Sequence, residues 1–242
     1  MRKSYAVIAL CAVALGAAPA AAATQEGKSW KTRAEASYVR TDGNADTETL
    51  AGKAEYSLDQ TPNRYFAGAT ALFGKTDGEK TASRWTLGGR YERTITDRLF
   101  GFVEANSLRD TFSGYDARIN LGPGVGYEFL KYEGLYLKGL ASGLYAYDNF
   151  SEGGSDSYAS GKLAADFWWQ ILENLKLTQK ASYLVSFDDT QVSFFDSETG
   201  LEVQVNSHVA LGVGYVVNYQ NEPPGDAKKT DTRFLTSLIV TY

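Results

Sequence analysis

The chain has 242 residues and a formal charge of −5 at pH 7, with one histidine, one cysteine and one methionine. This acidic balance, without any basic block, argues against nucleic acid as a partner, and a single cysteine excludes an internal disulfide. The 16 tyrosines, 12 phenylalanines and 4 tryptophans suit a membrane–water interface, where amphipathic rings are favoured.

The N-terminal segment has the three regions of a secretory signal peptide. Met1-Arg-Lys is positively charged, and Tyr5 to Leu15 is an apolar stretch too short to span a bilayer, which needs about 20 helical residues. An alanine-rich run over 17–23 offers A-x-A cleavage sites, and Leu10 before Cys11 argues against a lipoprotein. We therefore predict a cleaved signal peptide over residues 1–23 and a single domain over 24–242.

The rest of the chain follows a pattern of strand, turn and strand, with apolar and polar residues alternating in period two. We predict twelve strands, at residues 28–40, 48–58, 64–75, 82–93, 98–108, 115–129, 135–147, 158–171, 175–187, 191–205, 208–219 and 230–242.

The clearest alternation runs from Tyr115 to Phe129, with the charges on one face and the large apolar groups on the other. A segment of this length exceeds a usual soluble strand of about five or six residues and suits a tilted membrane strand of about 9–11 residues with an extension. Pro123 cannot donate to a sheet ladder, so we expect a bulge or local break near Gly122–Gly124.

The connections alternate between short turns and longer loops. The longer ones, at 41–47, 75–81, 148–157 and 220–229, are rich in Gly, Asp, Ser and Asn. This asymmetry, together with an even strand number, is typical of outer-membrane barrels. The sequence therefore predicts an all-β fold, a single antiparallel transmembrane β-barrel of about 12 strands, with 10–14 as the range.

Charged residues fall on one face of the predicted strands, in nearly equal numbers of both signs. A lipid-facing Arg or Lys at the bilayer midplane costs on the order of 2–4 kcal/mol, so these residues are expected to line the lumen. They can either form salt bridges that plug the lumen or line a narrow polar pore, and we favour a narrow or partly occluded lumen. The predicted lumen-lining residues are Arg33, Glu35, Lys53, Glu55, Arg84, Arg90, Glu92, Glu104, Asp116, Arg118, Glu128, Lys162, Asp166, Lys180, Glu202 and Arg233.

The last predicted strand ends on an aromatic residue, with Phe234, Leu238, Val240 and Tyr242 on one face. This pattern is typical of the C-terminal signal that the barrel-assembly machinery of the outer membrane binds. An ordinary terminal strand of a soluble sheet is the alternative interpretation.

Two motifs resemble those of a known family. They are Phe112-Ser-Gly-Tyr-Asp-Ala-Arg118 leading into Gly122-Pro-Gly-Val-Gly-Tyr127, and Pro223-Pro-Gly-Asp-Ala-Lys-Lys-Thr-Asp-Thr232 before the last strand. The chain resembles, over essentially its whole length after residue 23, the salt-induced outer-membrane protein family, domain of unknown function 481. The resemblance implies an outer-membrane barrel with no established activity or ligand. Tyr242 stands where that family more often has Phe.

Catalytic and metal-binding chemistry has little support in the sequence. The one histidine, His208, is expected at the periplasmic rim, and the loop carboxylates Asp148, Glu152, Asp156, Asp188 and Asp189 are expected to be solvated charges and not a Ca²⁺ site. We expect a non-enzymatic protein without cofactors, located in the bacterial outer membrane with lipid as its partner. An outer-membrane enzyme acting on envelope lipid and a soluble periplasmic ligand-binding barrel are the alternatives.

Overall fold

The computed structural model describes residues 29–41, 46–223 and 228–242, so the predicted signal peptide lies outside the described residues. Within the described part, no helix is long and apolar enough to cross a membrane. The strands are β1 (Ser29–Thr41), β2 (Thr47–Gln60), β3 (Asn63–Thr76), β4 (Glu79–Thr94), β5 (Leu99–Asp110), β6 (Tyr115–Tyr132), β7 (Leu135–Phe150), β8 (Ser155–Leu172), β9 (Leu175–Ser186), β10 (Ser193–Gln204), β11 (Val209–Gln220) and β12 (Thr230–Thr241).

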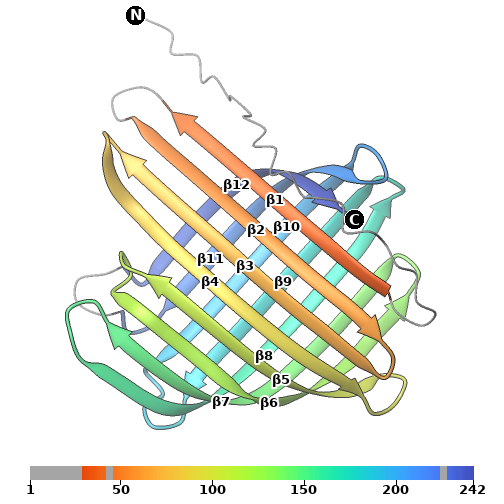
Figure 1. Ribbon diagram of the computed structural model, residues 1–242, viewed down its shortest axis with the longest axis horizontal. Helices are drawn as coiled ribbons and strands as arrows, with labels where there is room; N and C mark the ends of the chain where they lie inside the picture. The colour runs from red at the N-terminus through yellow and green to blue at the C-terminus, as the bar shows by residue number, and fades with distance from the viewer. Residues whose placement is uncertain (1–28, 42–45, 224–227) are drawn as a thin grey trace, which may run out of the picture.

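These strands form one closed antiparallel barrel, in which each strand pairs with its neighbours in sequence and β12 pairs with β1. The closing ladder runs from Arg33–Thr241 to Ala36–Leu238, and the backbone of Tyr242 exchanges two hydrogen bonds with Thr32. Figure 1 shows the near and far walls inclined in opposite directions, as tilted strands around a barrel must be. The predicted fold class is confirmed.

The two ends of the barrel differ. We call the end that carries residue 29, residue 242 and the β2–β3, β4–β5, β6–β7, β8–β9 and β10–β11 turns the terminal end, and the opposite one the loop end. Two of the longer loops predicted at the loop end are shorter in the structure. The 75–81 loop is largely strand and turns at Asp77–Gly78, both at positive φ as a tight hairpin turn requires, and the 148–157 loop shrinks to 151–154.

Between the register shifts of the ladders, side chains alternate between the two surfaces of the wall. Large apolar residues face outward, among them Leu163 and Phe234, whose exposed fractions are 63% and 64%. Charged residues of the same strands are largely covered inside the barrel, for example Glu92 at 2% and Glu104 at 6%. The exterior is therefore apolar and the interior polar.

One stretch of the interior is filled by an apolar cluster instead. Phe100 and Phe102 of β5 pack with Leu140 and with Ala164. The two phenyl rings pack directly on the backbone of β6 at Gly124 and Gly126. A Cβ atom at Gly124 would come within 2.2 Å of Phe102, and one at Gly126 within 2.2 Å of Phe100. Glycine is therefore required on this inner face of β6.

Pro123 interrupts the sheet on one side, as predicted. The β6–β7 ladder passes from Leu121–Tyr145 directly to Gly124–Ser142 without a register shift, whereas the β5–β6 ladder continues through Val103–Pro123. Because Pro123 has no N–H, β6 loses its pairing with β7 at this point, while its pairing with β5 is kept.

The glycine requirement is testable. Gly124→Ala is expected to destabilise the barrel by about 1–3 kcal/mol, because overpacking forces Phe102 from its place. Urea unfolding in detergent micelles measures this change. The matched control is Gly143→Ala, where a Cβ meets nothing within 4 Å and little change is expected. Equal stability of the two variants would contradict the packing described above.

Candidate functional site

A cavity of about 1150 Å³ occupies the lumen. Its lining reaches Asn206, Ser207 and Thr241 at the terminal end, and Ser113, Pro223 and Lys228 at the loop end. It is therefore continuous between the two ends of the barrel, and its wall is the candidate functional site.

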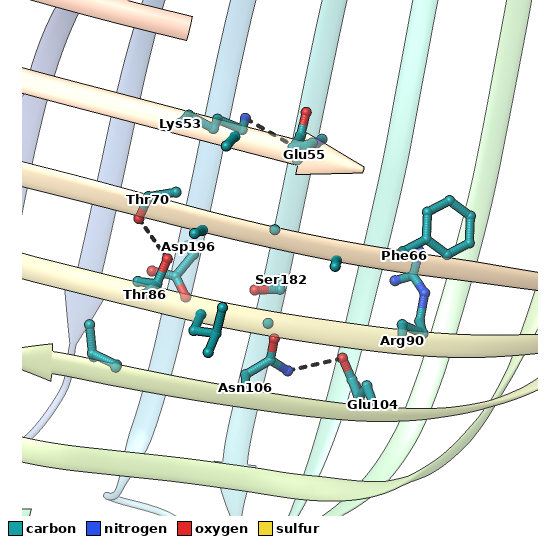
Figure 2. A pocket seen from close by; sticks show the side chains of 18 of the residues that line it. Lys53, Glu55, Phe66, Thr70, Thr86, Arg90, Glu104, Asn106, Ser182 and Asp196 are labelled. Atoms are coloured by element: carbon teal, nitrogen blue, oxygen red, sulfur yellow. Dashed lines mark hydrogen bonds and ion pairs between the residues drawn. The ribbon is translucent and has the colours of Figure 1, made fainter. Parts of the chain in front are cut away.

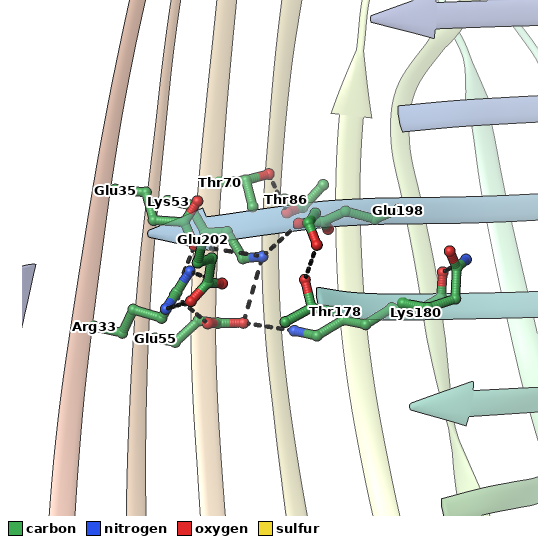
Figure 3. A network of polar contacts seen from close by, with 12 residues as sticks. Arg33, Glu35, Lys53, Glu55, Thr70, Thr86, Thr178, Lys180, Glu198 and Glu202 are labelled. Carbon is green, nitrogen blue, oxygen red and sulfur yellow. Dashed lines mark hydrogen bonds and ion pairs between the residues drawn. The ribbon is translucent and has the colours of Figure 1, made fainter. Parts of the chain in front are cut away.

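Ion pairs cross this lumen between strands that are not neighbours. The cross-lumen cluster consists of Arg33, Glu35, Lys53, Glu55, Lys176, Lys180, Glu198 and Glu202. Figure 3 shows most of its members, which extend from β1 and β2 on one side to β9 and β10 on the other. β9 and β2 are far apart in the barrel wall, because even along the shorter path around it β10, β11, β12 and β1 lie between them.

The distances in the cross-lumen cluster are those of direct charge-assisted bonds. Arg33 binds Glu202 across the lumen at 2.6 Å and Glu35 on its own strand at 2.7 Å. Lys53 reaches Glu198 at 3.0 Å, and Lys180 reaches Glu55 at 3.0 Å. Lys176 completes the cluster with a 2.9 Å contact to Glu202. These pairs narrow the passage without filling it.

A second set of ion pairs lies on the β3–β8 wall. Lys162 binds Glu104 at 2.7 Å, Arg90 binds Glu92 at 2.8 Å, and Lys138 lies between Asp166, at 3.3 Å, and Glu92, at 3.8 Å.

Two features adjoin this second set. Arg64 of β3 reaches Glu128 of β6 at 3.2 Å. The Arg90 guanidinium also lies 5.1 Å from the centroid of the Phe66 ring, a cation–π distance.

Near the loop end, one arginine ties several strands together. The Arg118 guanidinium forms two bonds to Asp148, of 2.8 and 3.0 Å, and Tyr158 donates its hydroxyl to the same carboxylate at 3.1 Å. The guanidinium lies between two rings, 3.9 Å from the centroid of Tyr115 and 3.8 Å from that of Phe194 on β10. Arg118 is 8% exposed and Asp148 1%, so the pair is desolvated.

The structure distributes the predicted lumen-lining residues over these three regions. The cross-lumen cluster contains Arg33, Glu35, Lys53, Glu55, Lys180 and Glu202. The β3–β8 wall contains Arg90, Glu92, Glu104, Glu128, Lys162 and Asp166. The loop-end region contains Arg118, Arg84, which pairs with Asp110 at 3.4 Å, and Arg233, which donates to Asn218.

Asp116 is the exception. Its side chain is exposed and accepts a 3.3 Å bond from Ser151 in the β7–β8 loop, while its neighbour Tyr115, expected on the outer face, is buried inside. A register shift in the β6–β7 ladder between Tyr115 and Ala117 explains the exchange, since one extra residue reverses the alternation before it.

Several lumen charges were missed from the sequence, notably Lys138, Asp148, Lys176 and Glu198. Lys138 and Asp148 share the inward face of β7 with Leu140 and Leu144, so that strand shows no polar face in its sequence. Lys138 and Asp148 are an even number of residues apart, so both must face the same side of the strand, and this spacing was the signal available in the sequence. Asp148, expected as a loop charge, lies within β7 and is buried.

His208 lies at the terminal end. Its Nδ1 is 2.8 Å from the hydroxyl of the adjacent Ser207, and its ring packs against Tyr242 with centroids 5.2 Å apart. Across the described residues, no carboxylate orients this ring, and no group of three or more His, Cys, Asp or Glu side chains is arranged to hold a metal ion. Phe234 and Tyr242 are exposed on the outer surface, at 64% and 61%.

The buried Arg118 pair gives a second prediction. Arg118→Met leaves the Asp148 carboxylate buried with only the Tyr158 hydroxyl, and is expected to lower the free energy of unfolding by about 3–5 kcal/mol. The double variant Arg118→Met/Asp148→Leu recovers most of that loss, because no charge is left unpaired. Arg98→Met, in an exposed turn, serves as the control. A single variant as stable as the control would show that the pair does not stabilise the barrel.

Comparisons with known proteins leave the activity open. The uncharacterized protein YdiY of Escherichia coli (strain K12) is 28% identical over 204 residues, which cover 84% of this chain and 79% of that protein. The solved structures include the NanC porin, with a TM-score of 0.49, 11% identity, and 88% of this chain and 98% of that one covered. They also include LpxR from Salmonella typhimurium, with a TM-score of 0.46, 8% identity, and coverage of 88% and 99%. Similarities this low do not bear on function. The family described as "Protein of unknown function, DUF481" matches residues 34–242, and the chain belongs to that family.

Proposed function

We propose that this protein is a non-enzymatic bacterial outer-membrane β-barrel whose lumen is a narrow polar pore, constricted by the cross-lumen cluster. The observation that carries the proposal is the sidedness of the wall. Exposed apolar side chains cover the outside, while a continuous cavity lined by charged groups runs inside.

The apolar exterior supports the membrane location. Trp85, Leu87, Val125, Leu163 and Leu201 are among many large side chains exposed on the outer face. Soluble monomers rarely expose apolar patches of more than a few hundred Å², whereas a band of this kind is what hydrocarbon solvates. A soluble ligand-binding barrel requires the opposite arrangement.

The cavity supports a pore in preference to a plug. Ion pairs that are already formed neutralise one another, so the passage offers water and polar solutes a path without a strong preference for one sign of charge. The interior of a pore of this kind also stays hydrated, which lowers the cost of keeping so many charges inside the barrel.

Location is tested by fractionation and heat-modifiable migration. The protein is expected in the outer-membrane fraction and to migrate differently in gels before and after boiling, because a closed barrel resists unfolding by detergent. Recovery of free protein from the periplasm would refute the membrane assignment.

The pore is tested in planar bilayers. Wild-type protein is expected to give small discrete conductance steps. Glu55→Ala/Lys180→Ala removes a pair that spans β2 to β9 and leaves Arg33, Lys53, Glu198 and Glu202 with partners. This variant is expected to raise the unit conductance on the order of twofold or more, because the constriction limits flow.

The matched control is Glu79→Ala/Lys80→Ala, at the exposed tip of the β3–β4 hairpin, which is expected to leave the conductance unchanged. Silence from folded wild-type protein and from the Glu55/Lys180 variant alike would exclude the pore and favour a purely structural role in the envelope.

A further inference from the structure

The inner wall recedes where two glycines meet. Gly68 of β3 is the register partner of Gly88 of β4, Gly88 pairs with Asn106 of β5, and Asn106 pairs with Asn120 of β6. All four line the lumen cavity. We call this row the glycine recess.

The Asn106 side chain lies against the backbone of Gly88. A Cβ atom at Gly88 would lie 2.6 Å from the Asn106 side-chain oxygen, so any larger residue displaces that amide. At Gly68 the nearest atoms to a Cβ position are 3.6 and 3.9 Å away, so a side chain there is tolerated but fills the hollow.

Uncharged hydrogen-bonding groups adjoin the recess on β3, β4 and β5, and Glu55 lies beside Gly68, with its Cγ 3.9 Å from the Cβ position there. Figure 2 shows Thr70, Thr86 and Asn106 on one wall of the cavity, on the neighbouring strands β3, β4 and β5. The Thr70 and Thr86 hydroxyls are 2.6 Å apart, and because only one of them donates in that bond, the other retains a free donor.

The asparagines have unused capacity. The Asn120 Oδ1 atom is buried and has no hydrogen-bond partner among the described residues. The Asn106 amide donates to Glu104 over a long 3.4 Å contact. A buried amide oxygen without a partner is unfavourable, and a ligand hydroxyl that donates to it removes that penalty.

The neighbouring charges already form ion pairs with one another, although the Arg90 Nε and Glu92 Oε1 atoms of one pair lack hydrogen-bond geometry. Glu104 accepts from Lys162 at 2.7 Å and from the Ser142 hydroxyl at 2.7 Å, and Arg90 is paired with Glu92 at 2.8 Å. A charged solute gains nothing here without breaking these pairs, whereas hydroxyl groups match the free amides and hydroxyls directly.

We infer that the glycine recess binds small neutral polyhydroxylated solutes, such as sugars and polyols. The inference rests on the proposed pore for the entry of these solutes, and it names the solute class that the pore would favour. A few placed polar groups in a concave wall are the usual composition of a small-ligand site.

Calorimetric titration of the folded, purified barrel tests the inference, in a detergent whose headgroup is not a sugar. Sucrose and sorbitol are the neutral probes, and glucosamine and glucuronate are the cationic and anionic ones. The wild-type protein is expected to bind the neutral probes more tightly than the charged ones. Gly68→Val, which fills the recess, is expected to weaken sucrose binding at least tenfold.

The matched control is Gly143→Val, because Gly143 lies on the outer face of the wall with open space around its Cβ position. It is expected to bind sucrose like the wild type. Asn106→Leu/Asn120→Leu gives a second variant should Gly68→Val fail to fold, as judged by heat-modifiable migration, and the same tenfold loss is expected.

The outcomes separate the two proposals. Sucrose binding without any conductance supports the recess and refutes the pore, while conductance without sucrose or sorbitol binding refutes the recess alone. Tighter binding of glucuronate or glucosamine, or unchanged sucrose binding by the recess variants, overturns the inference.

Discussion

Closure of the sheet is the constraint on which the rest of the molecule depends. Because β12 pairs with β1, every strand has two neighbours and no edge remains to be covered. A closed wall has only an inside and an outside, so the two-residue period of a strand sorts every side chain into one of two environments. The charged lumen and the apolar exterior are both consequences of that sorting.

The charges in turn shape the interior. Side chains from opposite walls meet because the barrel is narrow enough for a lysine on β9 to reach a glutamate on β2. The cations of the cross-lumen cluster and of the β3–β8 wall are each paired with an acid, which limits the cost of enclosing charge. Uncharged amides and hydroxyls are left with spare hydrogen-bonding capacity. The paired charges of the cross-lumen cluster and the uncharged groups of the glycine recess therefore line the same cavity.

The strands and their inward faces could be predicted from the sequence because alternation repeats over many residues and tolerates local exceptions. Asp116 was misplaced because a single extra residue in β6 reverses the alternation before it, and no residue type marks that irregularity. Lys138 and Asp148 were missed because β7 carries apolar residues on its inner face as well. Contacts such as Lys53–Glu198 depend on the stagger of strands distant in sequence, which a one-dimensional pattern does not contain.

The phenyl rings of Phe100 and Phe102 pack on the backbone of β6 and fill one side of the barrel interior with apolar groups. With this part of the inner wall occupied by hydrocarbon, the hydrogen-bonding groups of the lumen are unevenly distributed around it. In the proposed pore, a solute that needs hydrogen bonds would therefore contact the amides, hydroxyls and paired charges, and the apolar cluster would limit which strands it touches.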